Sequence, residues 1–154
     1  MIITAWRITK RKHARNAFSG EGAREFGGRW NNPGSAVVYT AQYQSLAALE
    51  MLVHLDSSEL LQKYVLIAVE FDESLITRVE SSALPRQWRS EPPPPEVRLI
   101  GDEWILSGTS AVLQVPSALV PGESNSLLNP GHKDFAKLSF GKPLSFRFDP
   151  RLAG

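Results

Sequence analysis

A short glycine-rich segment, Gly27-Gly28-Arg29-Trp30-Asn31, holds residue types that suit the binding of a charged ligand. Adjacent glycines let a backbone approach a ligand closely or adopt a positive φ. Arg29 follows them with a planar fork of donors that fits phosphate or carboxylate, and Trp30 could stack on a ring. The same residues also fit a tight turn with an exposed arginine and a core tryptophan. The segment is no Walker A loop and lacks the spacing of a dinucleotide fingerprint.

Glu50 stands in an apolar segment, Ser45–Leu55, that predicts a helix with Ser45 as its N-cap. Because the other positions in the middle of this helix are apolar, we expect it to be buried nearly all round. A carboxylate there is costly unless it is paired or lies at a cavity. Two interpretations stay open, a structural ion pair and a catalytic carboxylate at the base of a cleft. His54, one turn later, is expected to be a hydrogen-bonded neighbour rather than a metal ligand.

Three more polar side chains lie where they could reach a ligand. Tyr39 ends the strand that leads into the helix, a place where a tyrosine also simply packs. Ser117 lies in a constrained turn but lacks the G-x-S-x-G elbow of a hydrolase nucleophile, so we expect it to donate a hydrogen bond to a ligand. Asn125 lies in a second constrained polar segment, residues 123–130.

Composition excludes several kinds of site. The 154 residues include no cysteine, which excludes disulfides, thiolate metal ligands and a cysteine nucleophile. The three histidines, His13, His54 and His132, show no ligand spacing, so we predict no metal. No apolar run approaches the ~20 residues of a membrane span, and the basic start is the reverse of a secretory signal. We therefore expect a cytoplasmic protein without a membrane partner.

Charge is nearly balanced, with 17 Lys and Arg against 16 Asp and Glu and a net charge of +1, so it gives no argument for direct nucleic-acid binding. The balance hides a basic stretch within the first thirty residues, which either forms a solvated loop or lines a pocket for a phosphate-bearing ligand. Its members are Arg7, Lys10, Arg11, Lys12, Arg15, Arg24 and Arg29.

The elements that must position these residues indicate an α+β fold, a single compact domain with a strand-rich core and two or three helices. Residues 9–36 are predicted to form a long loop, packed through Phe18, Phe26 and Trp30, and residues 81–96 an extended or irregular stretch because of their prolines. Helices are expected at 45–55 and 101–107, with a further element at 133–138. Strands are expected at 1–8, 36–40, 64–71, 75–79, 111–115, 126–128 and 144–148.

Taken together, these segments resemble the RES-domain family, over about residues 5–130. Any one motif is weak, but six in this order and spacing are fairly specific. They are Trp6-Arg7-Ile8, Gly27-Gly28-Arg29-Trp30-Asn31, Val38-Tyr39-Thr40, Leu49-Glu50, Val115-Pro116-Ser117 and Asn125 to Pro130.

The resemblance implies a single RES domain over residues 1–154, with a fold similar to that of ADP-ribosyltransferases. RES proteins are toxins of bacterial toxin–antitoxin pairs, neutralised by an antitoxin with an Xre-type helix-turn-helix domain. They act on NAD+, which they hydrolyse, phosphorolyse or use to ADP-ribosylate a protein. By residue matching, Arg29, Tyr39 and Glu50 would be the central triad. Arg7 and Ser117 would support them, with Asn125 as a weaker contributor.

Cleavage of the nicotinamide–ribose bond passes through an oxocarbenium-like transition state, as in glycoside hydrolysis. Nicotinamide leaves as a neutral molecule, so the site needs little general acid. Glu50 would stabilise the developing charge, Arg29 with Arg7 would clamp the pyrophosphate, and Tyr39 or Trp30 would carry the nicotinamide. A non-catalytic module that binds nucleotide or nucleic acid is the rival interpretation, and a homodimer stays open.

Overall fold

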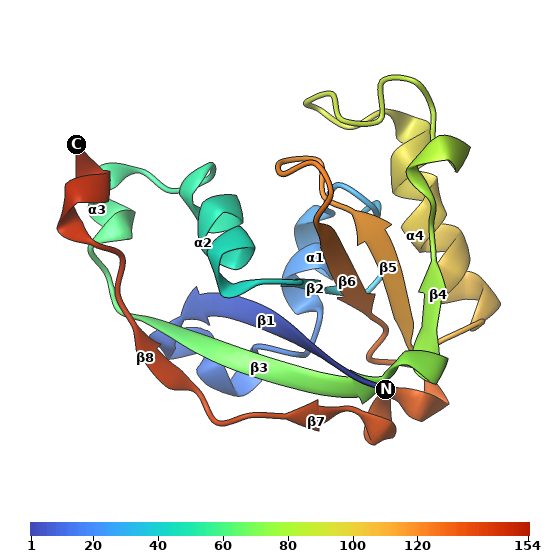
Figure 1. Ribbon diagram of the computed structural model, residues 1–154, viewed down its shortest axis with the longest axis horizontal. Coiled ribbons are helices and arrows are strands. Elements are labelled where there is room, and N and C mark those ends of the chain that lie inside the picture. The colour runs from blue at the N-terminus through green and yellow to red at the C-terminus, as the bar shows by residue number, and fades with distance from the viewer.

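A curled sheet of eight strands runs through the protein, and the computed structural model describes all of its residues, 1–154 (Figure 1). The strands are β1 (Ile2–Lys10), β2 (Val38–Ala41), β3 (Tyr64–Asp72), β4 (Ile76–Arg78), β5 (Val112–Pro116), β6 (Ser124–Leu128), β7 (Ser139–Phe140) and β8 (Leu144–Phe146). Their order is β4-β5-β6-β2-β1-β3-β7, and β8 also pairs with β3. Only β4 and β5 are parallel.

Helices cover the sheet and its ends. They are α1 (Glu21–Phe26), α2 (Gln44–Leu52), α3 (Ser57–Leu60) and α4 (Pro95–Ser107), and 3₁₀ turns occupy Arg11–Asn16, Glu73–Leu75, Ser81–Ala83, Lys133–Lys137 and Pro150–Ala153. The predicted α+β class is confirmed, although there are four α-helices where two or three were expected, because the short α1 and α3 were not predicted. The longest helix, α4, has 13 residues, and none of the helices has the length and apolar character needed to cross a bilayer.

The sheet opens between β1 and β2, and this opening creates the site. Strand β1 pairs with β3 over its whole length, from Ile2 opposite Asp72 to Lys10 opposite Tyr64. It meets β2 at a single position, Trp6 opposite Ala41. The two parts of the sheet therefore diverge, with β1 and β3 on one side and β4, β5 and β6 on the other, as Figure 1 shows.

Two apolar clusters stabilise the two sides of this opening. One packs α2 and the C-terminal segment on β1 and β3, through Leu46, Tyr64 and Phe148 among others. The other packs α4 on β5 and β6, through Trp104 and Leu127 among others. A third cluster, around Val69, Phe71, Val112 and Leu128, joins the two parts of the sheet. Burial of such side chains is the main favourable contribution to folding, at about 25 cal/mol per Å² of apolar surface.

Helix α2 differs from its prediction. It begins at Gln44, its N-cap is Tyr43 without a side-chain bond, and Ser45 is not the cap. Only Leu46 and Ala47 are buried, while Leu49 is 44% exposed, so the expectation of burial nearly all round was wrong. One face of the helix packs on the sheet, and the rest of it borders the cleft or stays on the surface.

Other predicted boundaries shift as well. The loop expected at 9–36 contains the 3₁₀ turn Arg11–Asn16 and helix α1, and Phe26, expected to pack, is 78% exposed. The helix expected at 101–107 begins earlier, at Pro95, because a proline at the first helical position lacks only an N–H that the helix does not use. It ends at Gly108, whose φ of 62° is left-handed.

Candidate functional site

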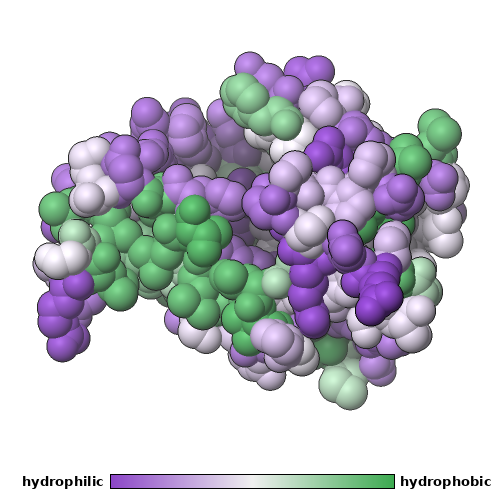
Figure 2. All heavy atoms as spheres, turned by 90° about the horizontal axis from the view of Figure 1, so that it is seen from above, coloured by the Kyte–Doolittle hydropathy of each residue, from purple (hydrophilic) through white to green (hydrophobic).

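A deep cleft of about 1070 Å³ lies at the opening of the sheet, between α2 on one side and the Gly27–Asn31 turn and α4 on the other. Figure 2 looks down on the hollow, which separates the end that carries α3 from the end that carries α4. Six of the seven predicted site residues line it, namely Arg7, Arg29, Trp30, Tyr39, Glu50 and Asn125. The glycine-rich turn and the helix that follows β2 thus form two walls of one cavity.

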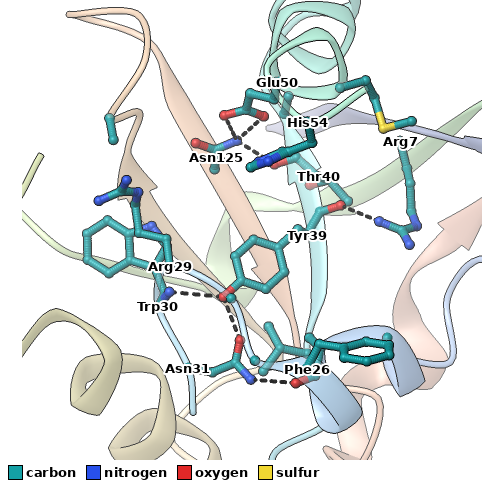
Figure 3. A pocket seen from close by; sticks show the side chains of 18 of the residues that line it. Arg7, Phe26, Arg29, Trp30, Asn31, Tyr39, Thr40, Glu50, His54 and Asn125 are labelled. Carbon is teal, nitrogen blue, oxygen red and sulfur yellow. Dashed lines mark hydrogen bonds between the residues drawn. The ribbon is translucent and has the colours of Figure 1, made fainter. Parts of the chain in front are cut away.

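Glu50 lies on the cleft side of α2, and its closest polar partner is Asn125. The Asn125 Nδ2 donates to Glu50 Oε1 at 2.9 Å and to Oε2 at 3.0 Å (Figure 3). No cation pairs with Glu50, so the structural ion pair is absent. Burial raises the pKa of Glu50 to about 7, the Asn125 bonds lower it, and the charge of Glu123 raises it. The carboxylate therefore titrates near neutral pH.

Strand β6 fixes Asn125 in this position. Asn125 is opposite Ala41 in the β2–β6 register and is 7% exposed. Its Nδ2 also donates to the Thr40 carbonyl at 3.1 Å. Two strands thus hold the amide that orients Glu50.

The Tyr39 hydroxyl is used inside the fold. It accepts a hydrogen bond from the Trp30 N–H at 3.0 Å and donates to Asn31 Oδ1 at 2.6 Å (Figure 3). Burial raises the pKa of this phenol well above its usual value. The approach is so close that a Cβ on Gly28 would lie 2.5 Å from the Tyr39 Oη. Because the hydroxyl is occupied, the part of Tyr39 that is available to a ligand in the cleft is its ring.

Helix α4 holds the glycine-rich turn from behind, which the sequence did not indicate. The Gly101 N–H donates to the Trp30 carbonyl at 2.9 Å, and a Cβ on Gly101 would collide with that oxygen. Asp102 accepts from the backbone N–H of Asn32 at 3.0 Å and from its side chain at 2.6 Å. A glycine followed by an acid within an amphipathic helix was the only available signal, and it is not specific.

Trp30 packs inside the fold and does not present its ring for stacking on a ligand. It is 2% exposed, and its ring centroid lies 6.0 Å from that of Trp88. The stacking role expected for it has little accessible ring surface to use, which leaves Tyr39 as the better-placed aromatic group.

Arg7 is a partly buried cation without an anionic partner. Its Nη1 donates to the Tyr39 carbonyl at 3.1 Å, and its Nε is buried with no partner at all. Burial lowers the pKa of its guanidinium, but arginine stays charged at any physiological pH. An uncompensated buried charge is costly, so this wall of the cleft is suited to an anion.

Arg29 lies at the other end of the cleft and is held by one segment. Its Nη1 donates to the carbonyls of Trp88 and Ser90 at 3.1 and 3.0 Å. Its Nη2 donates to Glu91 Oε2 at 2.7 Å. Figure 3 places Arg7 and Arg29 on either side of Tyr39.

The rest of the basic N-terminal stretch does not line the cleft. Lys10 pairs with Glu59, and Arg24 pairs with Glu21 on the surface. The expected basic pocket wall reduces to Arg7 and Arg29, because within the turn Arg11–Asn16 only Asn16, which is uncharged, reaches the cleft. Two arginines that the sequence did not single out, Arg89 and Arg98, line the cleft instead.

Ser117 and His54 differ from their predictions. Ser117 is fully buried, and its Oγ accepts from the backbone N–H groups of Leu119 and Val120, so it stabilises a turn and does not line the cleft. His54 lines the cleft but forms no hydrogen bond with Glu50. No group of three or more His, Asp or Glu side chains is placed to hold a metal ion.

The family follows from comparison of the whole chain with known proteins. The family model of the RES domain matches residues 4–149. The chain belongs to the RES-domain family. This RES chain is 46% identical over 148 residues to a protein named Toxin Res from Yersinia enterocolitica, covering 96% of this chain and 97% of that protein.

Two more similarities bear on this RES domain. A protein named Prs ADP-ribosylating toxin, from Sphingobium sp. strain YBL2, is 36% identical over 157 residues, covering 99% of this chain and 98% of that protein. A chain of the MbcT–MbcA toxin–antitoxin complex of M. tuberculosis superposes with a TM-score of 0.76 at 21% identity, covering 99% of this chain and 87% of that one. The latter similarity concerns the fold.

Proposed function

We propose that this RES protein is the toxin of a toxin–antitoxin pair and that it cleaves the nicotinamide–ribose bond of NAD+. The observation that carries the proposal is Glu50, a carboxylate without a cation that Asn125 orients in a deep cleft. The relatives named Toxin Res and Prs ADP-ribosylating toxin support it.

Glu50 stabilises the transition state. As the bond to nicotinamide breaks, its electron pair leaves with the ring nitrogen, which becomes neutral, and positive charge develops on the ribose. A fixed carboxylate next to the ribose favours that charge, and its oxygens also accept from ribose hydroxyls. The Asn125 amide holds both oxygens in place, so little reorganisation is needed when the charge develops.

The arginines bind the pyrophosphate. Arg7 has a buried Nε without a partner and no acidic neighbour, so an anionic ligand would supply the missing counter-charge. Arg29 lies farther along the same cleft and supplies a second contact. The Tyr39 ring supports the nicotinamide, and its hydroxyl keeps the glycine-rich turn in place.

Transfer of ADP-ribose to a protein is the second candidate, because a relative named as an ADP-ribosylating toxin is 36% identical along nearly the whole chain. Hydrolysis, phosphorolysis and protein modification share the first bond cleavage and differ in the acceptor. The cleft residues described above serve the first bond cleavage in all three reactions. The experiment below therefore has to identify the acceptor of ADP-ribose.

An antitoxin of the Xre helix-turn-helix type is the proposed partner, in the cytoplasm. A solved structure with the same fold belongs to a toxin–antitoxin complex. Apolar side chains are exposed at the α3 end, among them Leu61, Leu144 and Leu152, and a second copy of the chain could cover this surface in a homodimer (Figure 2).

The test is nicotinamide release by purified protein incubated with NAD+ in water, with phosphate, and with a cell extract as acceptor. We expect release in at least one condition, and labelled NAD+ shows whether ADP-ribose is freed, phosphorylated or attached to protein. Glu50→Gln is the matched control and should release none. Absence of release in all three conditions would refute the proposal.

A further inference from the structure

One end of the cleft is closed by residues 88–93, a segment that we call the strap. Arg89, Glu91, Pro92 and Pro93 of the strap line the cleft. The strap is fixed at its start by Trp88, which is buried against Trp30. Its end is also fixed, because Arg98 of α4 donates to the Pro93 carbonyl at 3.1 Å and the prolines restrict the backbone.

Glu91 is the acidic residue of the strap and it points at Arg29. Its Oε2 accepts from Arg29 Nη2 at 2.7 Å. The Glu91 side chain is 74% exposed, whereas that of Arg29 is 19% exposed. An ion pair with one solvent-exposed partner stabilises little, so a ligand that offers a better anion can displace the carboxylate.

Arg29 would keep its position if Glu91 left. Its Nη1 bonds to the Trp88 and Ser90 carbonyls do not involve the Glu91 side chain. A guanidinium has five N–H donors, and the three bonds described leave further donors for a ligand. A phosphate brings more charge than a carboxylate and accepts from two N–H groups at once.

We propose that Glu91 occupies, in the free protein, the position on Arg29 that a phosphate of the substrate takes, and that it thereby weakens substrate binding. Glu91 is then an affinity-determining residue rather than a catalytic one. The inference rests on the proposed function for the choice of a pyrophosphate-bearing ligand. Only a rotation of the Glu91 side chain is required, because both ends of the strap are held.

The test is isothermal titration with ADP-ribose, which carries the pyrophosphate and cannot be cleaved at the nicotinamide bond. Glu91→Gln keeps a hydrogen-bond acceptor for Arg29 but removes the competing charge. We expect it to bind ADP-ribose about two- to fivefold more tightly than the unaltered protein. The gain should shrink in about 0.5 M NaCl, since salt screens exposed charges.

Three controls separate competition from other effects. Glu96→Gln removes the same charge from an exposed position on α4 that does not line the cleft, and should leave affinity unchanged. Adenosine, which has no phosphate, should bind equally to all variants. In an Arg29→Gln background, Glu91→Gln should have no effect, because the charge it competes for is gone.

A purely structural Glu91 predicts the opposite sign, since a loosened strap would weaken ADP-ribose binding. Weaker or unchanged binding by Glu91→Gln therefore overturns the proposal, as does failure of ADP-ribose to bind either protein. The outcome is independent of nicotinamide release. A protein that binds ADP-ribose more tightly after Glu91→Gln yet never cleaves NAD+ refutes the proposed function and leaves this inference standing.

Discussion

Asn125 donates through one amide nitrogen to both carboxylate oxygens of Glu50, at 2.9 and 3.0 Å. The two residues are far apart in sequence, one on β6 and one on α2, and they meet because β6 pairs with β2, the strand that leads into α2. The contact fixes the orientation of the carboxylate and opposes the effect of burial on its pKa. It makes Asn125 a positioning residue for Glu50.

Replacing Asn125 with alanine should lower kcat/KM for nicotinamide release by about ten- to a hundredfold at pH 7, the effect of a lost hydrogen bond to a charged group. It should also raise the pKa of Glu50 further, because the Asn125 bonds lower it. Initial rates measured as a function of pH check both. Asn129→Ala, at a buried asparagine outside the cleft, controls for lost stability. An unshifted pH profile in Asn125→Ala would contradict the positioning role.

The rate of NAD+ cleavage should rise with pH through about 7 and then level off. Burial raises the pKa of Glu50 to about 7, and the proposed mechanism needs the ionised form. The measurement is kcat/KM for nicotinamide release between about pH 5 and 9. A rate that falls with rising pH across this range would mean that protonated Glu50 is the active form.

Glu50→Gln should abolish toxicity yet stabilise the fold at alkaline pH. A carboxyl whose pKa rises from 4.5 to about 7 on folding favours the folded state only while protonated, and this contribution is lost as the pH rises through 7. A neutral amide avoids that loss, so we expect a gain of roughly 1–2 kcal/mol at pH 8 and almost none near pH 4.5. Denaturant titrations at both pH values check it, and an equal difference at both would contradict the burial argument.

The Tyr39 hydroxyl should contribute mainly to stability and the Tyr39 ring mainly to activity. Tyr39→Phe leaves the Trp30 N–H and the Asn31 Oδ1 without their partner, which should cost about 1–3 kcal/mol of stability while the ring retains most of the activity. Tyr39→Ala should lose both the stability and the activity. Thermal unfolding and nicotinamide release, with the exposed Tyr43→Phe as control, make the comparison. Full loss of activity in a stable Tyr39→Phe would instead give the hydroxyl a chemical role.

Arg7→Met should weaken ADP-ribose binding at least tenfold and leave the free protein as stable as before or more so. Methionine fills similar space, and its introduction removes a partly buried charge that has no acidic partner. Titration with ADP-ribose and thermal unfolding without ligand measure the two effects. Arg24→Met, at a surface arginine, is the control. A large loss of stability with unchanged binding would make Arg7 a structural residue.

Local pattern was enough to predict most elements, and six of the seven candidate site residues line the cleft. The apolar runs at 64–71 and 111–115 correspond to β3 and β5. The helix predicted at 101–107 is present, but its start at Pro95 was missed because a proline run is extended in most contexts, and packing on β5 and β6 favours the helical start.

The sequence by itself determined the family, the α+β class and the candidate residues, because the order of motifs and the hydrophobic periodicity are both present in the linear chain. Tertiary structure alone decided what each residue does, since burial and hydrogen-bond partners depend on segments far apart in the chain. It turned the Tyr39 hydroxyl inward, buried Ser117 in a turn, paired Arg29 with Glu91 and left Arg7 without an acidic partner. The bond from Asn125 to Glu50 exists only because two distant strands pair side by side.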